Sequence, residues 1–92
     1  MMSVVLITGC SSGFGMLSAA RLSAAGHTVY ASMRNLQKRE ALLAEVKRRG
    51  GKVKLLKLDV TDNATIDNAM NTIESEKGRL DILINNAGYG LG

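Results

Sequence analysis

The 92-residue sequence contains no proline and no tryptophan, and it has only one cysteine and one histidine. A single cysteine, Cys10, excludes an intramolecular disulfide framework and a cysteine-based zinc finger, and it fits a reducing compartment. A single histidine, His27, excludes a histidine-rich metal site, so we expect no metal. No apolar run approaches the ~18 residues of a membrane span, and the apolar residues 4–7 are too few for a signal peptide. We therefore expect a cytoplasmic protein with no membrane segment in this part.

Charge is also limited, with twelve basic and eight acidic residues and a net charge of +4. A hydrophobic content of 46% excludes a disordered tail. The densest basic stretch, residues 38–57, has no aromatic residues between its lysines and arginines. We interpret it as a solvated helix face with flanking loops and expect no nucleic-acid partner. A further interpretation is that one of these cations meets a phosphate group on a small ligand.

Short apolar runs alternate with segments of helical periodicity along the chain. The runs predict strands at residues 3–8, 28–32, 53–58 and 80–85, of which the first and last are buried. A first helix is predicted from Met16 to Ala25, with an apolar stripe on Leu17, Ala20 and Ala24. A second is marked by Leu36, Leu42, Leu43 and Val46. A third, capped by Thr61 or Asp62, has an inner face of Ile66, Ala69, Met70 and Ile73.

Strands that alternate with helices pair in parallel through right-handed crossovers. The sequence therefore predicts an α/β fold, the N-terminal half of a Rossmann-type doubly wound parallel sheet with strand order 3-2-1-4. The first two helices would cover one face of the sheet, and the third helix would cover only part of the other face. The fourth strand would have an unpaired edge, where a fifth strand would be expected. The start of a β/α barrel is the alternative, but the glycine-rich loop after the first strand argues against it.

That loop reads Thr-Gly-Cys-Ser-Ser-Gly-Phe-Gly and lies between the first strand and the first helix. Gly9 can take the tight turn, Gly13 allows close approach of a ligand, and Gly15 allows the helix to pack on the strand. Hydroxyl donors suited to phosphate oxygens come from Ser11 and Ser12. The glycine spacing matches neither the Gly-x-Gly-x-x-Gly fingerprint nor a P-loop. Its place between strand and helix indicates a dinucleotide pyrophosphate site, with a purely structural turn as the alternative.

Three motifs resemble those of the classical short-chain dehydrogenases/reductases. Residues 8–15 match the family's Thr-Gly-x-x-x-Gly-x-Gly, residues 59–60 match its Asp-Val, and residues 85–88 match its Asn-Asn-Ala-Gly. The residues around these motifs look most like those of the hydroxysteroid and retinol dehydrogenase branch. Phe14 departs from the usual isoleucine, but its backbone N–H would carry the phosphate contact, so we expect little consequence.

The resemblance implies a nicotinamide dinucleotide cofactor, and the second strand indicates which one. An acidic residue at the end of this strand would bind the ribose hydroxyls and repel a 2′-phosphate. Here that position is Ser32, and no acidic residue occurs between Gly15 and Glu40. Arg34 can pair with a phosphate dianion, so NADP(H) is favoured. If Arg34 is only a solvated cation, NAD(H) is also possible. Lys38 could help if a helix begins near Asn35.

Other family positions imply the rest of the adenosine site. Asp59 resembles the residue that receives the adenine amino group, with Val60 on the base; the alternative for Asp59 is a cap of the third helix. The segment that resembles the one beside the adenosine ribose is Asn86, Ala87 and Gly88. For Asn85 we favour a structural role. The full set of predicted cofactor-binding residues is Thr8, Gly9, Ser11, Ser12, Gly13, Phe14, Gly15, Ser32, Arg34, Asp59, Val60, Asn86, Ala87 and Gly88.

Four further residues invite a functional interpretation that we do not favour. Cys10 lies in the anion loop, where N–H groups could lower its thiol pKa, but a small structural residue is the favoured interpretation. His27 is assigned to the surface and Tyr30 to the core. Tyr89 has no lysine four residues later, so it does not match the family's catalytic Tyr-x-x-x-Lys. The catalytic serine is unmatched as well, so no catalytic residue is predicted here.

The resemblance implies that residues 1–92 are the N-terminal part of a single NAD(P)-binding domain, apparently truncated. The intact enzyme would transfer hydride between NADP(H) and a carbonyl or secondary alcohol, and the branch that it resembles implies a steroid-like or retinol-like substrate. The resemblance also implies that the intact protein is a homo-oligomer. This part alone is predicted to be inactive, because it lacks a general acid and base. The alternatives are a non-catalytic NAD(P)-binding module or redox sensor, or an inactive fragment. A methyltransferase would need an acidic residue at the end of the second strand to bind the ribose of its ligand, and none is present there.

Overall fold

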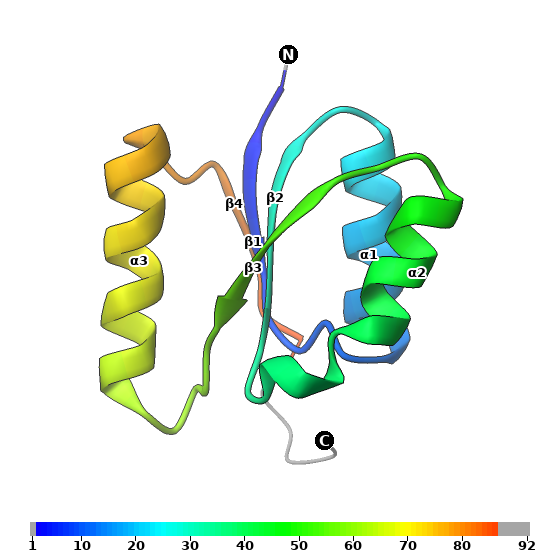
Figure 1. The fold of residues 1–92 in the computed structure, drawn as a ribbon. Helices are drawn as coiled ribbons and strands as arrows, with labels where there is room; N and C mark the ends of the chain where they lie inside the picture. Colours follow the sequence, from blue (N-terminus) through cyan, green and yellow to red (C-terminus); the bar gives the residue numbers. More distant parts are fainter. Residues whose placement is uncertain (1, 87–92) are drawn as a thin grey trace.

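A computed structural model describes residues 2–86 of the chain as a parallel sheet with helices on both faces (Figure 1). The strand order is β3-β2-β1-β4, and every neighbouring pair is parallel, which confirms the predicted topology. In chain order the elements are β1 (Val4–Ile7), α1 (Gly13–Ala24), β2 (Thr28–Met33), the 3₁₀ turn η1 (Leu36–Lys38), α2 (Glu40–Arg48), β3 (Val53–Lys57), α3 (Asn63–Lys77) and β4 (Ile82–Ile84).

The sheet separates two groups of buried apolar side chains. Helices α1 and α2 cover one face and α3 covers the other, as Figure 1 shows. The larger group lies on the side of α1 and α2 and contains Val5, Ile7, Cys10, Ala19, Ala20, Val29, Ala31, Met33, Leu42 and Val46. The group on the α3 side contains Val4, Leu6, Tyr30, Leu58, Ala69 and Ile73. Because successive strand residues point to opposite faces, both sides of β1 are covered and all four of its residues are buried.

The element boundaries differ from the predicted ones mostly near the glycine loop. Helix α1 begins at Gly13 rather than Met16, so the last two glycines of the loop already lie in its first turn. Strand β2 continues one residue beyond Ser32, to Met33. A separate 3₁₀ turn follows Asn35, whose side chain accepts a hydrogen bond from the N–H two residues later (2.9 Å), and α2 starts only at Glu40.

Several apolar residues predicted to face inward are partly exposed. Leu17 is 38% exposed, Leu43 38% and Met70 40%, and Ala24 is also exposed. The buried side of α1 consists instead of small residues, namely Gly15, Ala19, Ala20 and Ser23. Small residues let the helix axis lie close to the sheet, so a leucine is left at the margin of the contact.

Strand β4 was predicted to be buried, and this is wrong for two of its residues. Ile82 is 42% exposed and Leu83 56% exposed. Strand β4 lies at one end of the strand order and pairs with β1 alone within residues 2–86. The predicted unpaired edge is therefore present in the described part of the chain, and it accounts for the exposure of these side chains.

A polar cluster near the C-terminal end of α3 joins this helix to β2 and β3. The Tyr30 hydroxyl donates to Glu76 Oε1 (2.6 Å), and the Lys54 ammonium pairs with the same oxygen (3.0 Å). The Lys54 nitrogen also lies 5.6 Å from the centroid of the Tyr30 ring. Tyr30 is fully buried, as predicted. Its hydroxyl thus connects the core to a surface ion pair.

This cluster makes stability depend on pH at the alkaline end. Burial, followed by the hydrogen bond and the negative charge of Glu76, raises the pKa of Tyr30 to about 12. A raised pKa means that the contribution of this group to stability is complete below the ordinary tyrosine pKa of about 10 and is lost as the pH rises through 12. We expect Tyr30→Phe to lower the free energy of unfolding by about 1 kcal/mol at pH 7. Urea unfolding at pH 7 and pH 11 tests this, since the cost of Tyr30→Phe should shrink at pH 11. An equal cost at both pH values would contradict it.

Candidate functional site

The connections that follow β1, β2 and β3 lie at one edge of the sheet, the lower edge in Figure 1. Parallel strands place their carboxyl ends together, so these loops gather the predicted site residues. The chain leaves β1 towards β2 and β3 and later returns to β4 on the other side of β1. The carboxyl end of β1 is therefore the point where strand order reverses, the usual ligand position in open α/β sheets.

The N-terminus of α1 opens onto this point. Ser12 occupies the N-cap position in extended conformation, yet its side chain makes no capping hydrogen bond, and the first turn has no acidic residue. By contrast, the side chains of Asn35 and Asp62 cap the helical turns that follow β2 and β3. The first N–H groups of a helix have no partner inside the helix and carry partial positive charge. An anion could therefore be held at the start of α1 by Gly13, Phe14 and their neighbours.

Two of the loop glycines have positive φ angles and the third makes a very close contact. Gly9 has φ of 69° and Gly13 has φ of 61°, a region that other residues rarely adopt. A Cβ atom on Gly15 would lie 2.3 Å from the Gly9 carbonyl oxygen, so the first turn of α1 packs directly on the backbone of the loop. Space is open beside Gly13, where an added Cβ would meet no atom within 4 Å. This combination of a tight turn and an open approach fits the phosphates of a dinucleotide.

Thr8 and the residues after β4 form the floor beneath the loop. Thr8 is buried, and its Oγ1 donates to Asn85 Oδ1 and accepts from the Asn86 N–H, both at 2.9 Å. The Asn86 side-chain amide donates to the Gly9 carbonyl (3.3 Å). Asn85 therefore has the structural role that we favoured. Asn86 is exposed beside the loop, where it was predicted to contact the ribose.

The end of β2 supports the other side of the loop. The Cys10 N–H donates to the Ser32 carbonyl (2.9 Å), and the Ser32 hydroxyl donates to the Ile7 carbonyl (2.9 Å). Ser32 is fully buried, and its hydroxyl is used in a hydrogen bond within the sheet. Because serine is uncharged, this end of β2 carries no negative charge at position 32. Met33, which actually ends β2, is uncharged as well. Arg34 follows it and is exposed.

Asp59 lies after β3, close to Arg34. Its carboxylate accepts from the Thr61 N–H (2.9 Å) and the Thr61 hydroxyl (2.7 Å). These hydrogen bonds, with smaller contributions from the charges of Arg34 and Lys57, lower the pKa of Asp59. Asp59 is thus a carboxylate whose negative charge is stabilised by hydrogen bonds within its own loop. The N-cap of α3 is Asp62 and not Asp59. Val60 beside it is 37% exposed, which leaves an apolar surface available to a ring.

The two hydrogen bonds from Thr61 to the Asp59 carboxylate were not predicted from the sequence. The signal was present, since Asp-x-Thr is a common pattern in which a carboxylate accepts from the backbone two residues later. Thr65 also stabilises the backbone at this position, because its hydroxyl accepts a hydrogen bond from the Asp59 N–H (2.9 Å). The loop after β3 is therefore fixed by two threonines that the motif comparison did not include.

The remaining candidates are placed away from ligand chemistry or outside the described part. Burial raises the pKa of the Cys10 thiol to about 12, and the thiol donates to the Ile7 carbonyl (3.2 Å), so Cys10 is a structural residue. His27 Nδ1 accepts from the Ser3 N–H (3.0 Å) at the opposite edge of the sheet. Three positions lie outside the described residues, namely Ala87, Gly88 and Tyr89.

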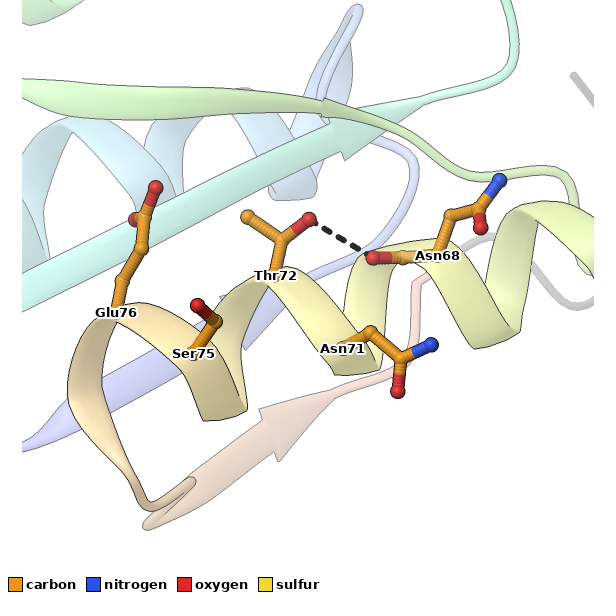
Figure 2. Close-up of a pocket in the computed structure, with 5 residues that line it drawn as sticks. All are labelled: Asn68, Asn71, Thr72, Ser75 and Glu76. Carbon is orange, nitrogen blue, oxygen red and sulfur yellow. Dashed lines mark hydrogen bonds between the residues drawn. The ribbon is translucent and has the colours of Figure 1, made fainter.

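An open hollow of about 400 Å³ lies along α3 and contains none of the predicted cofactor residues. Figure 2 shows its five polar lining residues, Asn68, Asn71, Thr72, Ser75 and Glu76, all carried by α3. The Thr72 hydroxyl donates to the Asn68 carbonyl (2.8 Å), a bond within the helix. Across residues 2–86, no three His, Cys, Asp or Glu side chains gather as a metal site would require. Nor is any helix in that range long and apolar enough to cross a membrane.

Comparison with known proteins agrees with this geometry. Residues 3–91 match the model of the short chain dehydrogenase family. The chain is 44% identical over 89 residues to a 3-ketodihydrosphingosine reductase of Bacteroides thetaiotaomicron, covering 97% of this chain and 29% of that protein. It is 41% identical over 95 residues to 17-beta-hydroxysteroid dehydrogenase type 1 of Mus musculus, covering 97% and 27%. The chain thus spans under a third of the length of either relative.

Solved structures show the same arrangement. A metagenomic short-chain oxidoreductase in complex with NADP superposes with a TM-score of 0.84 at 31% identity, covering 96% of this chain and 40% of that one. An NAD⁺-bound xylitol dehydrogenase superposes with a TM-score of 0.80 at 29% identity, covering 95% and 34%. The family match extends over nearly the whole sequence, and the strand order and glycine loop agree with it. The chain belongs to the short-chain dehydrogenase family.

Proposed function

We propose that this chain forms the adenosine-phosphate half of an NADP(H) site, in a dehydrogenase that acts on a carbonyl or secondary alcohol. The observation that carries the proposal is the uncapped N-terminus of α1 at the point where the strand order reverses. Such a helix end favours an anion. The neighbouring strand ends supply a cation, Arg34, and an anchored carboxylate, Asp59.

Each part of the adenosine-phosphate half of the cofactor would meet a matching group. The first-turn N–H groups of α1 and the hydroxyls of Ser11 and Ser12 would bind the pyrophosphate. The Asp59 carboxylate, held by its hydrogen bonds from Thr61, would accept from the adenine amino group, with the base on Val60. Asn86 would contact the adenosine ribose, and the same is proposed for Ala87 and Gly88.

The choice of NADP(H) rests on charge at the end of β2. Neither Ser32 nor Met33 carries a charge that would repel a 2′-phosphate, and Arg34 offers a planar guanidinium suited to phosphate oxygens. The similar solved structures include one bound to NADP and one bound to NAD⁺, so the choice depends on the charges of this chain. Asp59 favours the second candidate, NAD(H), because it compensates part of the positive charge of Arg34.

The bound nicotinamide would give a hydride to a carbonyl or accept one from a secondary alcohol, and the residues of this chain would orient and hold the cofactor. The substrate is proposed from the relatives, one named for a 3-ketodihydrosphingosine and one for a 17-beta-hydroxysteroid. Both names point to an oxygen-bearing carbon on a large apolar molecule. A cytoplasmic location and a homo-oligomer remain predictions.

We expect Arg34→Gln to weaken NADPH binding about tenfold, or about 1.4 kcal/mol, and to change NADH binding less than twofold. The reason is that only NADPH carries the 2′-phosphate that the guanidinium would bind. Fluorescence titration of both cofactors against the wild type and the variant measures this directly. Arg79→Gln, which removes an equal charge at the opposite edge of the sheet, is the control and should leave both affinities unchanged. An equal loss for NADPH and NADH in Arg34→Gln would refute the 2′-phosphate role.

A further inference from the structure

The carboxyl ends of β2 and β3 carry a second cation besides Arg34. Lys57 is the last residue of β3, it is exposed, and it was not among the predicted site residues. It is paired in register with Met33, the residue directly before Arg34. The backbone therefore places Lys57 and Arg34 on adjacent strand ends at the same edge of the sheet.

The direction of the Lys57 side chain follows from the pleat of β3. Val53 and Leu55 pack against the core group on the side of α1 and α2. Because side chains alternate along a strand, Lys57 points to that same face. The glycine loop and the 3₁₀ turn that follows Arg34 also lie on this side, as Figure 1 shows. Lys57 thus stands on the side of the sheet from which the phosphates would be bound.

The balance of charge here calls for more than one cation. Arg34 and Lys57 both act on Asp59 and help to lower the pKa of its carboxyl group, after the hydrogen bonds from Thr61. Both cations are therefore within electrostatic reach of the Asp59 carboxylate. Asp59 compensates one of the two positive charges, whereas a phosphate monoester brings a charge of about −1.5 to −2 at neutral pH. With Arg34 alone, the nearby carboxylate would offset part of the attraction between the guanidinium and the phosphate.

We propose that Lys57 is the second cation of the 2′-phosphate site and thereby determines, with Arg34, the preference for a 2′-phosphorylated adenosine. This assignment rests on the proposed NADP(H) function and adds to it a residue from a different strand. Lysine is suited to the role, because its flexible side chain can bring a point charge to one phosphate oxygen while the guanidinium donates two N–H groups from its edge to the others.

Lys57 has an alternative role as a charged residue on an edge strand, where lysine discourages pairing with another chain. Lys52, just before the opposite end of β3, provides the matched comparison. It is also exposed, and its replacement removes the same charge from the molecule. A local phosphate contact depends on Lys57 alone, whereas a general charge effect is shared by both lysines.

The test uses adenosine 2′,5′-bisphosphate and adenosine 5′-monophosphate, because the described residues form only the adenosine side of the site. Isothermal titration calorimetry would compare wild type, Lys57→Gln, Lys57→Arg and Lys52→Gln. We expect Lys57→Gln to weaken the bisphosphate about fivefold and the monophosphate less than twofold. Lys57→Arg should retain most of the bisphosphate affinity, and Lys52→Gln should match the wild type.

The outcomes separate this proposal from the one on which it rests. If wild type prefers the bisphosphate and Lys57→Gln keeps that preference, the role of Lys57 is wrong while the NADP(H) function stands. The role of Lys57 is equally wrong if Lys52→Gln weakens the bisphosphate as much as Lys57→Gln does. If wild type binds both ligands equally, the NADP(H) proposal fails first. A selective loss in Lys57→Gln, restored in Lys57→Arg, supports both.

Discussion

Gly15→Ala should lower the free energy of unfolding by about 3 kcal/mol and abolish measurable cofactor binding. The added Cβ would lie 2.3 Å from the Gly9 carbonyl oxygen and 2.8 Å from its carbonyl carbon. These are backbone atoms, and Gly9 is itself held by the side-chain amide of Asn86. Relief of the clash must therefore move either α1 or the loop. Both movements displace the N–H groups that would bind the pyrophosphate.

Gly13→Ala in the same loop is the matched control. A Cβ at Gly13 meets no atom within 4 Å, so its cost comes only from the positive φ of 61°. We expect that cost to be about 1 kcal/mol. Chemical denaturation with circular dichroism gives both values, and titration with NADPH reports the site. If Gly15→Ala costs no more than Gly13→Ala, the close packing of α1 on the loop is not what the sequence requires at position 15.

Thr8→Val should cost about 2 kcal/mol in stability and weaken cofactor binding as well. Valine keeps the shape of the side chain but removes the hydroxyl that donates to Asn85 and accepts from the Asn86 N–H. Thr8 is only 3% exposed, so water replaces these bonds poorly. The segment after β4 would then lose its link to the end of β1. The bond from the Asn86 amide to the Gly9 carbonyl depends on that link.

Thr8→Ser separates the hydroxyl from the methyl group. Serine retains both hydrogen bonds and loses only one buried carbon, so we expect a cost below about 1 kcal/mol and nearly normal NADPH affinity. Denaturation curves and cofactor titrations on the two variants give the comparison. Equal effects of valine and serine would show that packing at position 8, and not the link to β4, sets the geometry of the loop.

The topology could be predicted from the sequence because its cause is regular. Each apolar run and each helical segment occurs in strict alternation, and right-handed crossovers leave few ways to arrange four such strands. The cap of α3, predicted as Thr61 or Asp62, is Asp62, and it was predictable because capping is local and depends on residue type. The glycine motif was predictable because backbone geometry restricts which residues fit there.

What could not be predicted depends on distances between elements. The spacing of Leu17 and Met70 fits a helical stripe, but how close each helix lies to the sheet decides whether they are covered. Ser32 has the residue type of a phosphate donor, yet its hydroxyl is taken by the Ile7 carbonyl of the neighbouring strand. The cation at Lys57 belongs to a strand whose register with β2 is a tertiary fact. In each case the deciding contact lies far along the chain from the residue concerned.

The link between Thr8 and Asn86 also has a consequence for synthesis of the chain. Residues separated by 78 positions in sequence must meet before the floor of the phosphate loop exists. At a translation rate of about 5 to 20 residues per second, the loop waits about 4 to 16 seconds for its partner after it is made. During that interval the Gly9 carbonyl lacks the hydrogen bond that it accepts from the Asn86 amide. The support of the glycine loop by Asn86 is therefore completed only after β4 has been synthesised and has paired with β1.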